Sequence, residues 1–219
     1  LEADGQPDLE ALSALDVALL RECVAALLSG GEVQMPRFDF TVSRRAPKRY
    51  PLKLADDQLL VMEGIHGLNP ALHEGFDPSL IAKVYISELT CLNLDNHNRI
   101  PTSYLRLLRR IVRDYETRGA SVQHTLSMWD SVRSGEKRWI FPYQENADVI
   151  FNSSTLYEIA VLKKHIFPLL TAVEPEDPCY EAVQGIVKIL NYVLEADVDD
   201  EIPPTSLVRE FIGGNSFYR

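Results

Sequence analysis

Cysteine, basic charge and long apolar runs are all scarce in this 219-residue sequence, and each shortage excludes a class of protein. The three cysteines are odd in number and far apart, with no Cys-x-x-Cys pair, which argues against a disulfide framework or a structural zinc site. No apolar run is long enough to span a membrane. Lys and Arg number 22 against 32 Asp and Glu, so non-specific nucleic-acid binding is not expected. These features predict a cytoplasmic protein that binds neither membranes nor nucleic acid.

Apolar periodicity predicts short strands that alternate with helices. The expected strands are 57–62, 81–86 and 147–151, and the expected helices are 8–28, 102–118, 121–134, 155–172, 178–195 and 205–211. Alternation of this kind indicates an α/β fold with a mostly parallel sheet covered by helices. Prolines and aromatics between 32 and 54 predict an extended hairpin. We expect two domains, a core over 1–154 and a helical C-terminal extension over 155–219.

The helix expected at 102–118 concentrates arginine in an otherwise acidic chain. Four arginines share one arc of this helix: Arg106, Arg109, Arg110 and Arg113. Arg118 follows one turn later. Arginine forks match phosphate oxygens and could neutralise the charge of a transferred phosphoryl group. The alternatives are a solvated basic face, arginines paired with carboxylates elsewhere in the fold, or a surface for an acidic protein partner.

Two further segments carry candidate binding residues. Glu63 follows the expected strand 57–62, where ligands bind in open α/β sheets, and it could hold a water on Mg²⁺ or be a surface residue in a glycine turn. His66 is either a ligand-contacting or a structural histidine. In the hairpin, Phe38 could stack on a base and Asp39 could accept from sugar hydroxyls. Alternatively, these aromatics pack on their own domain.

In this order, the segments resemble the uridine kinase and phosphoribulokinase superfamily of P-loop kinases over most of residues 4–151. The resemblance rests on Pro36-Arg-Phe-Asp-Phe40 in the hairpin, Glu63-Gly-Ile-His-Gly-Leu68, and Arg106-x-x-Arg-Arg-x-x-Arg-Asp114 in the family's lid helix. Asn96-His-Asn-Arg-Ile-Pro101 and Arg209-Glu-Phe-Ile-Gly-Gly214 resemble a uridine kinase-like subgroup. Its members often carry a threonyl-tRNA-synthetase-like N-terminal region.

This resemblance implies an activity and a set of site residues. The activity is ATP-dependent transfer of a phosphoryl group to the 5′-hydroxyl of a pyrimidine nucleoside, with Mg²⁺ near Glu63. The implied catalytic lid residues are Arg109, Arg110, Arg113 and Arg118. The implied substrate-binding residues are Phe38, Asp39, Arg45, His66 and Arg106. The helices after residue 155 have apolar stripes that could pack on the core or on a second copy, so a homo-oligomer is an open alternative.

The sequence departs from the family pattern in two ways. No Gly-x-x-x-x-Gly-Lys-Ser/Thr phosphate loop occurs in the 219 residues, and the family's loop and catalytic aspartate would precede Leu1. We therefore expect that the sequence begins inside a longer kinase and that this chain alone does not turn over. Phe38 and Ser43 stand where the family usually has tyrosine and histidine, which removes hydrogen-bonding groups from the nucleoside site. Alternatives are a non-catalytic nucleotide- or partner-binding relative, or a kinase for another small acceptor.

Overall fold

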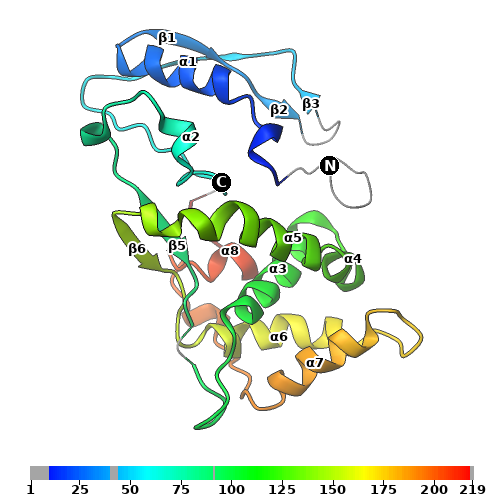
Figure 1. The fold of residues 1–219 in the computed structure, drawn as a ribbon. Coiled ribbons are helices and arrows are strands. Elements are labelled where there is room, and N and C mark those ends of the chain that lie inside the picture. The colour runs from blue at the N-terminus through cyan, green and yellow to red at the C-terminus, as the bar shows by residue number, and fades with distance from the viewer. Residues whose placement is uncertain (1–9, 40–43, 91, 218–219) are drawn as a thin grey trace. The chain divides into compact units, whose positions relative to one another are not determined.

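The computed structural model describes residues 10–39, 44–90 and 92–217 (Figure 1). Backbone contacts divide the chain into two compact units. Unit 1 comprises residues 1–85 and 134–149, and unit 2 comprises residues 86–133 and 150–219. The fold is α/β, with helices in both units and small sheets. No helix in the described ranges is long and apolar enough to cross a membrane.

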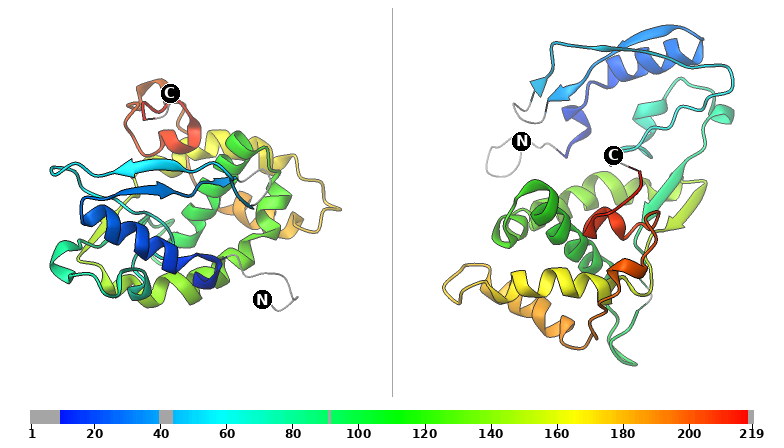
Figure 2. Two further views of the ribbon diagram at one scale, coloured as in Figure 1. Left: turned by 90° about the horizontal axis from the view of Figure 1, so that it is seen from above. Right: turned by 180° about the vertical axis from the view of Figure 1, so that it is seen from behind.

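Unit 1 is built around a helix and a hairpin. Up to residue 83, its α-helices and strands are α1 (Val17–Leu28), β1 (Glu32–Met35), β2 (Phe38–Asp39), β3 (Arg44–Arg45), β4 (Tyr50–Lys53) and α2 (Pro70–His73). The Asp16 carboxylate accepts a hydrogen bond from the backbone N–H of Leu19 and so caps the start of α1. β1 pairs with β4 and β2 with β3, all antiparallel. Figure 2 shows β1 and β4 lying along α1, where Cys23, Leu27 and Val33 form a small core.

The strand expected at 57–62 does not form, and the prediction was wrong. The side chains of Leu59 and Val61 are 90% and 85% exposed, and this segment has no regular structure. An apolar run becomes a strand only when its backbone groups find a partner strand. In the described part of the chain, the strands pair as β1 with β4, β2 with β3 and β5 with β6, and the backbone of 59–62 joins none of these sheets.

The chain passes between the units along two parallel strands, β5 (Val84–Ser87) and β6 (Val149–Asn152). The N–H of Asp148 bonds to the carbonyl of Lys83 at 2.9 Å, and the N–H of Ser153 bonds to that of Ser87 at 2.8 Å. The strands expected at 81–86 and 147–151 are therefore present with shifted bounds. The expected parallel sheet is present as this pair.

Unit 2 is a helical assembly around α3 (Thr102–Arg118), which spans the residues predicted from the sequence. The other α-helices, running from green to red in Figure 1, are α4 (Val122–Ser127), α5 (Trp129–Gly135, which ends in unit 1), α6 (Glu158–Thr171), α7 (Tyr180–Leu190) and α8 (Arg209–Ile212). α3 packs against α4, α6 and α8, and α7 packs against α6. The fully buried side chains of this core include Leu105, Leu108, Leu162, Ile166, Leu170, Val183 and Leu190. The helices after residue 155 thus share one core with the arginine-rich helix.

Candidate functional site

The arginine-rich helix α3 has one deeply buried face and ends at a glycine. Leu105 and Leu108 are wholly buried. Gly119 has φ of 64° in the left-handed region, which favours glycine, and its N–H bonds to the Asp114 carbonyl. The side chains of the five arginines differ in exposure, and their ion-pair partners divide them into two groups.

Arg109 points into the core of unit 2. Its Nε and Nη2 donate to the two carboxylate oxygens of Glu158, the second at 2.7 Å. Nη1 donates to Ser153 Oγ at 3.1 Å and Nη2 to the Ser153 carbonyl at 2.8 Å. The guanidinium carbon lies 5.1 Å from the centre of the Phe211 ring. Arg109 is therefore held by buried partners, which favours the paired alternative that the sequence left open.

A second carboxylate lies between Arg109 and Arg106. Glu88 Oε1 is 3.0 Å from Arg106 Nε, and Glu88 Oε2 is 3.6 Å from Arg109 Nη1. We name the set Arg106, Arg109, Glu88 and Glu158 the buried quartet after its three buried members, since the Arg106 side chain is 28% exposed. Its two positive and two negative charges sum to zero.

The other three arginines of α3 surround Asp114. The Asp114 carboxylate lies 3.4 Å from Arg110 Nε, 3.4 Å from Arg113 Nε and 3.1 Å from Arg118 Nη1. It also accepts a 3.5 Å hydrogen bond from the hydroxyl of Thr125 on α4. Asp114 is 8% exposed in its side chain, whereas the arginines are 27%, 28% and 57% exposed. We name these four residues the Asp114 cluster. Within the cluster three arginines face one carboxylate, and Arg118 is the most exposed of them.

The hairpin residues belong to unit 1. Phe38 is half exposed on β2, opposite Arg45 on β3, and Asp39 is its partly buried neighbour. Arg45 Nη2 lies 3.0 Å from Asp16 Oδ2. The pKa of the Asp16 carboxyl is lowered, first by the hydrogen bond from the Leu19 N–H at the start of α1 and second by the hydrogen bond from Arg45. Ser43 lies outside the described residues.

Glu63 and His66 lie in a turn of unit 1. Glu63 is exposed, beside Gly64, and the strand expected to present it is absent. His66 is buried, with its ring edge-on to Trp139 at 6.0 Å between centroids. Its Nδ1 has no hydrogen-bond partner among the described residues. Over the same ranges, no group of three His, Cys, Asp or Glu side chains is placed to hold a metal ion.

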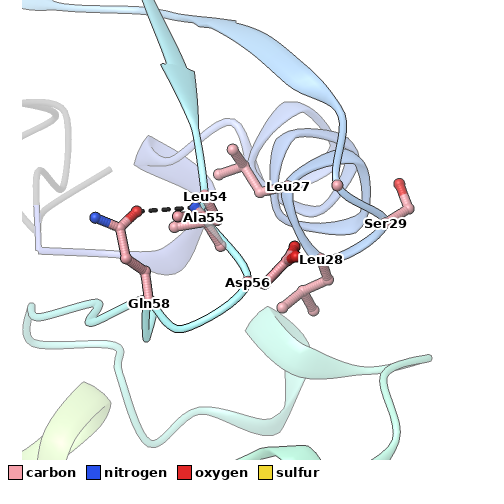
Figure 3. Close-up of a pocket in the computed structure, with 8 residues that line it drawn as sticks. Leu27, Leu28, Ser29, Leu54, Ala55, Asp56 and Gln58 are labelled. Atoms are coloured by element: carbon pink, nitrogen blue, oxygen red, sulfur yellow. Dashed lines mark hydrogen bonds between the residues drawn. The ribbon is translucent and has the colours of Figure 1, made fainter.

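A pocket of about 390 Å³ lies elsewhere in unit 1, between the end of α1 and the segment after β4 (Figure 3). Its lining residues are Leu27, Leu28, Ser29, Gly30, Leu54, Ala55, Asp56 and Gln58. The Gln58 side chain accepts a hydrogen bond from the Ala55 N–H at 3.0 Å. None of the sequence-predicted site residues lines this pocket, and its one carboxylate gives it no catalytic pair.

Sequence reasoning missed the carboxylates of the buried quartet, although Glu158 carried a signal. It stands at the head of an i, i+4 series with Leu162, Ile166 and Leu170, and all four side chains have no exposed surface. A charge on a fully apolar stripe needs a buried partner of opposite sign. Glu88 has no comparable signal, because it follows a short strand.

Comparison with known proteins points to one family. The phosphoribulokinase/uridine kinase family is matched by residues 4–160. A uridine kinase of Vibrio atlanticus (strain LGP32) is 31% identical over 161 residues, which are 72% of this chain and 67% of that protein. The uridine kinase of Vibrio campbellii is 31% identical over 163 residues, covering 73% and 68%. That of Halobacterium salinarum is 30% identical over 140 residues, covering 63% and 54%.

These matches place the chain in a family of kinases, the class of enzymes that transfer phosphoryl groups. The chain belongs to the phosphoribulokinase/uridine kinase family. The resemblance drawn from the hairpin, the Glu63 turn and the arginine helix is thereby confirmed at the level of the family.

Proposed function

We propose that this chain forms the acceptor-binding and lid part of a nucleoside kinase, which transfers the γ-phosphoryl group of ATP to the 5′-hydroxyl of uridine or cytidine. The observation that carries the proposal is the family match over residues 4–160. Relatives named uridine kinases, about 30% identical to this chain, favour a nucleoside as the acceptor.

The Asp114 cluster supplies the positive charge that such a reaction needs. Phosphoryl transfer depends on positioning and on cations that meet the charge spread over the phosphate oxygens. Arg110, Arg113 and Arg118 lie around one buried carboxylate and are partly exposed. The carboxylate holds the three side chains together, and the surplus charge is directed to the phosphates.

The nucleoside is assigned to the hairpin. Phe38 is half exposed and can stack on a base, and the Asp39 carboxylate can accept from ribose hydroxyls. Because phenylalanine lacks a hydroxyl, Phe38 offers no hydrogen bond to a base edge. We therefore expect weaker discrimination between bases than a tyrosine would give.

ATP and Mg²⁺ are the cofactors of this proposal. Mg²⁺ commonly takes one or two carboxylates together with water and substrate phosphates, so the single exposed carboxylate of Glu63 fits only in the company of phosphates. When bound, the ion neutralises phosphate charge. No Gly-x-x-x-x-Gly-Lys-Ser/Thr phosphate loop occurs among these 219 residues, so the proposal assigns to them the acceptor site and the lid.

A non-catalytic relative is the second candidate. The observation in its favour is that the buried quartet uses two of the five lid arginines for internal ion pairs. Such a protein would keep the fold and an anion-binding cluster without transferring phosphate. A kinase of the same family with another small acceptor remains the third reading.

The deciding experiment measures ADP release from Mg²⁺-ATP with a panel of nucleosides and other small alcohols. This chain and the full open reading frame are tested side by side. The proposal expects turnover with uridine or cytidine for the full reading frame alone. Turnover only with another acceptor would move the substrate, and no turnover with either protein would favour the non-catalytic relative.

A matched pair of variants tests the lid role in an active protein. Arg113→Gln removes one charge of the Asp114 cluster and is expected to lower kcat about tenfold or more. Arg99→Gln removes an exposed arginine that bonds to Thr102 near the other end of α3 and should leave kcat unchanged. Equal kcat values for both variants would contradict the lid assignment.

A further inference from the structure

Glu158 is a charged side chain in a place built for apolar ones. It begins α6 and is itself wholly buried. The residues that follow it at intervals of four on the same helix face are wholly buried too: Leu162, Ile166 and Leu170. Transfer of a lone carboxylate into such a place is very costly, so its presence requires a fixed cation. The cation here is Arg109.

Arg109 in turn has no nitrogen left for a phosphate. Nε and Nη2 donate to Glu158, Nη1 donates to Ser153 Oγ, and Nη2 also reaches the Ser153 carbonyl. The Phe211 ring covers one face of the guanidinium. Only 10% of the Arg109 side chain is exposed. A ligand at Arg109 would have to displace buried partners first.

Exposure separates Arg109 from the arginines of the Asp114 cluster. The Arg109 side chain is 10% exposed, whereas those of Arg110, Arg113 and Arg118 are 27%, 28% and 57% exposed. A phosphate can therefore reach the cluster without displacing the buried partners of Arg109.

We propose that Glu158 is a positioning residue that converts Arg109 into a structural anchor of α3, so that the Asp114 cluster alone meets the phosphates. The proposal rests on the proposed function for the phosphate role of the cluster. It departs from the family resemblance, which places Arg109 among the catalytic lid residues. The helices after residue 155 then act in the reaction indirectly, by fixing the helix that carries the cluster.

The test compares single and double replacements of the pair in the full open reading frame. Arg109→Met removes the cation of the buried Glu158 carboxylate, and Glu158→Met leaves Arg109 only the 3.6 Å contact to Glu88, so each should lower Tm by about 6–20 °C. The double variant Arg109→Met/Glu158→Met replaces the pair with apolar side chains and should regain most of that Tm. Glu116→Gln, an exposed site on the same helix, is the control for an unspecific charge change.

Turnover separates an anchor from a phosphate ligand. If Arg109 is an anchor, the refolded double variant should keep kcat and the KM for ATP within about twofold of the wild type. A double variant that regains Tm but loses kcat about tenfold or more would show that Arg109 meets the phosphates, and the proposal would fail. Single variants with the Tm of the control would also overturn it.

Two provisions keep the result decisive. Should the methionine pair not fold, the pair Arg109→Gln/Glu158→Gln removes both charges and keeps polar side chains, and failure of both doubles to regain Tm refutes the anchor. Should the wild-type protein phosphorylate no acceptor, the proposed function fails. The Tm comparison then still decides whether Glu158 and Arg109 stabilise the fold as a pair.

Discussion

Replacement of Asp114 by asparagine is expected to loosen the three arginines that surround it. The carboxylate lies 3.1–3.4 Å from Arg110, Arg113 and Arg118, and without its charge these side chains repel one another. Because the arginines are partly exposed, each pair contributes about 0.2–1 kcal/mol, and the three together contribute about 0.6–3 kcal/mol. For a chain of this size, a loss of about 2 kcal/mol lowers Tm by roughly 4–8 °C.

The assay is thermal unfolding followed by circular dichroism at low and high salt, with Glu116→Gln as the control. Salt screens the exposed repulsion, so the deficit of Asp114→Asn should shrink as the Debye length falls from about 10 Å at 0.1 M to about 3 Å at 1 M. Inorganic polyphosphate should raise the Tm of the variant more than that of the wild type, because the surplus charge is larger. A Tm equal to that of the control at low salt would refute the cluster.

Other predictions concern the same unit. Tyr104→Phe removes the 2.6 Å hydrogen bond to the Ile186 carbonyl and should cost about 1 kcal/mol in urea denaturation. Burial raises the pKa of the Tyr104 phenol, so wild-type stability should hold below about pH 10 and fall above it, a fall that the variant lacks. Gly119→Ala places a Cβ atom on a residue whose φ is 64° and should lower stability by about 1–2 kcal/mol in the same denaturation assay. Gly119→Asn should lower stability by less. Burial raises the pKa of Asp199, but the Lys164 hydrogen bond and nearby charges lower it overall. Stability from this group should thus be lost as pH falls below about 4, and an acid titration should show a smaller loss in Lys164→Met.

The sequence predicts α3 well because every local signal agrees. Leucines at helical spacing, arginines on a separate arc and Gly119 after the last turn define both its face and its end. The sequence does not predict the partner of each arginine, because partners come from tertiary placement. Arg109 and Glu158 are 49 residues apart, and only the packing of α6 on α3 brings them together.

The segment 57–62 shows the opposite case. Its apolar residues predict burial in a sheet, yet a strand depends on backbone pairing with a neighbour that no local pattern specifies. Leu59 and Val61 are exposed in the structure, and Glu63 is presented by a turn. The position of a site residue is therefore predicted less reliably from the end of an expected strand than from the face of an expected helix.

The pair of Arg109 and Glu158 is a directional contact between α3 and α6. A stripe of leucine, isoleucine and valine can pack against another in several registers of similar energy, because apolar contact is not directional. A shift of either helix by one turn would break the hydrogen bonds that Arg109 makes to Glu158 and Ser153. The ion pair at the head of the stripe thus adds a geometric requirement to two helices whose remaining contacts, Leu108 and Leu162 among them, are apolar.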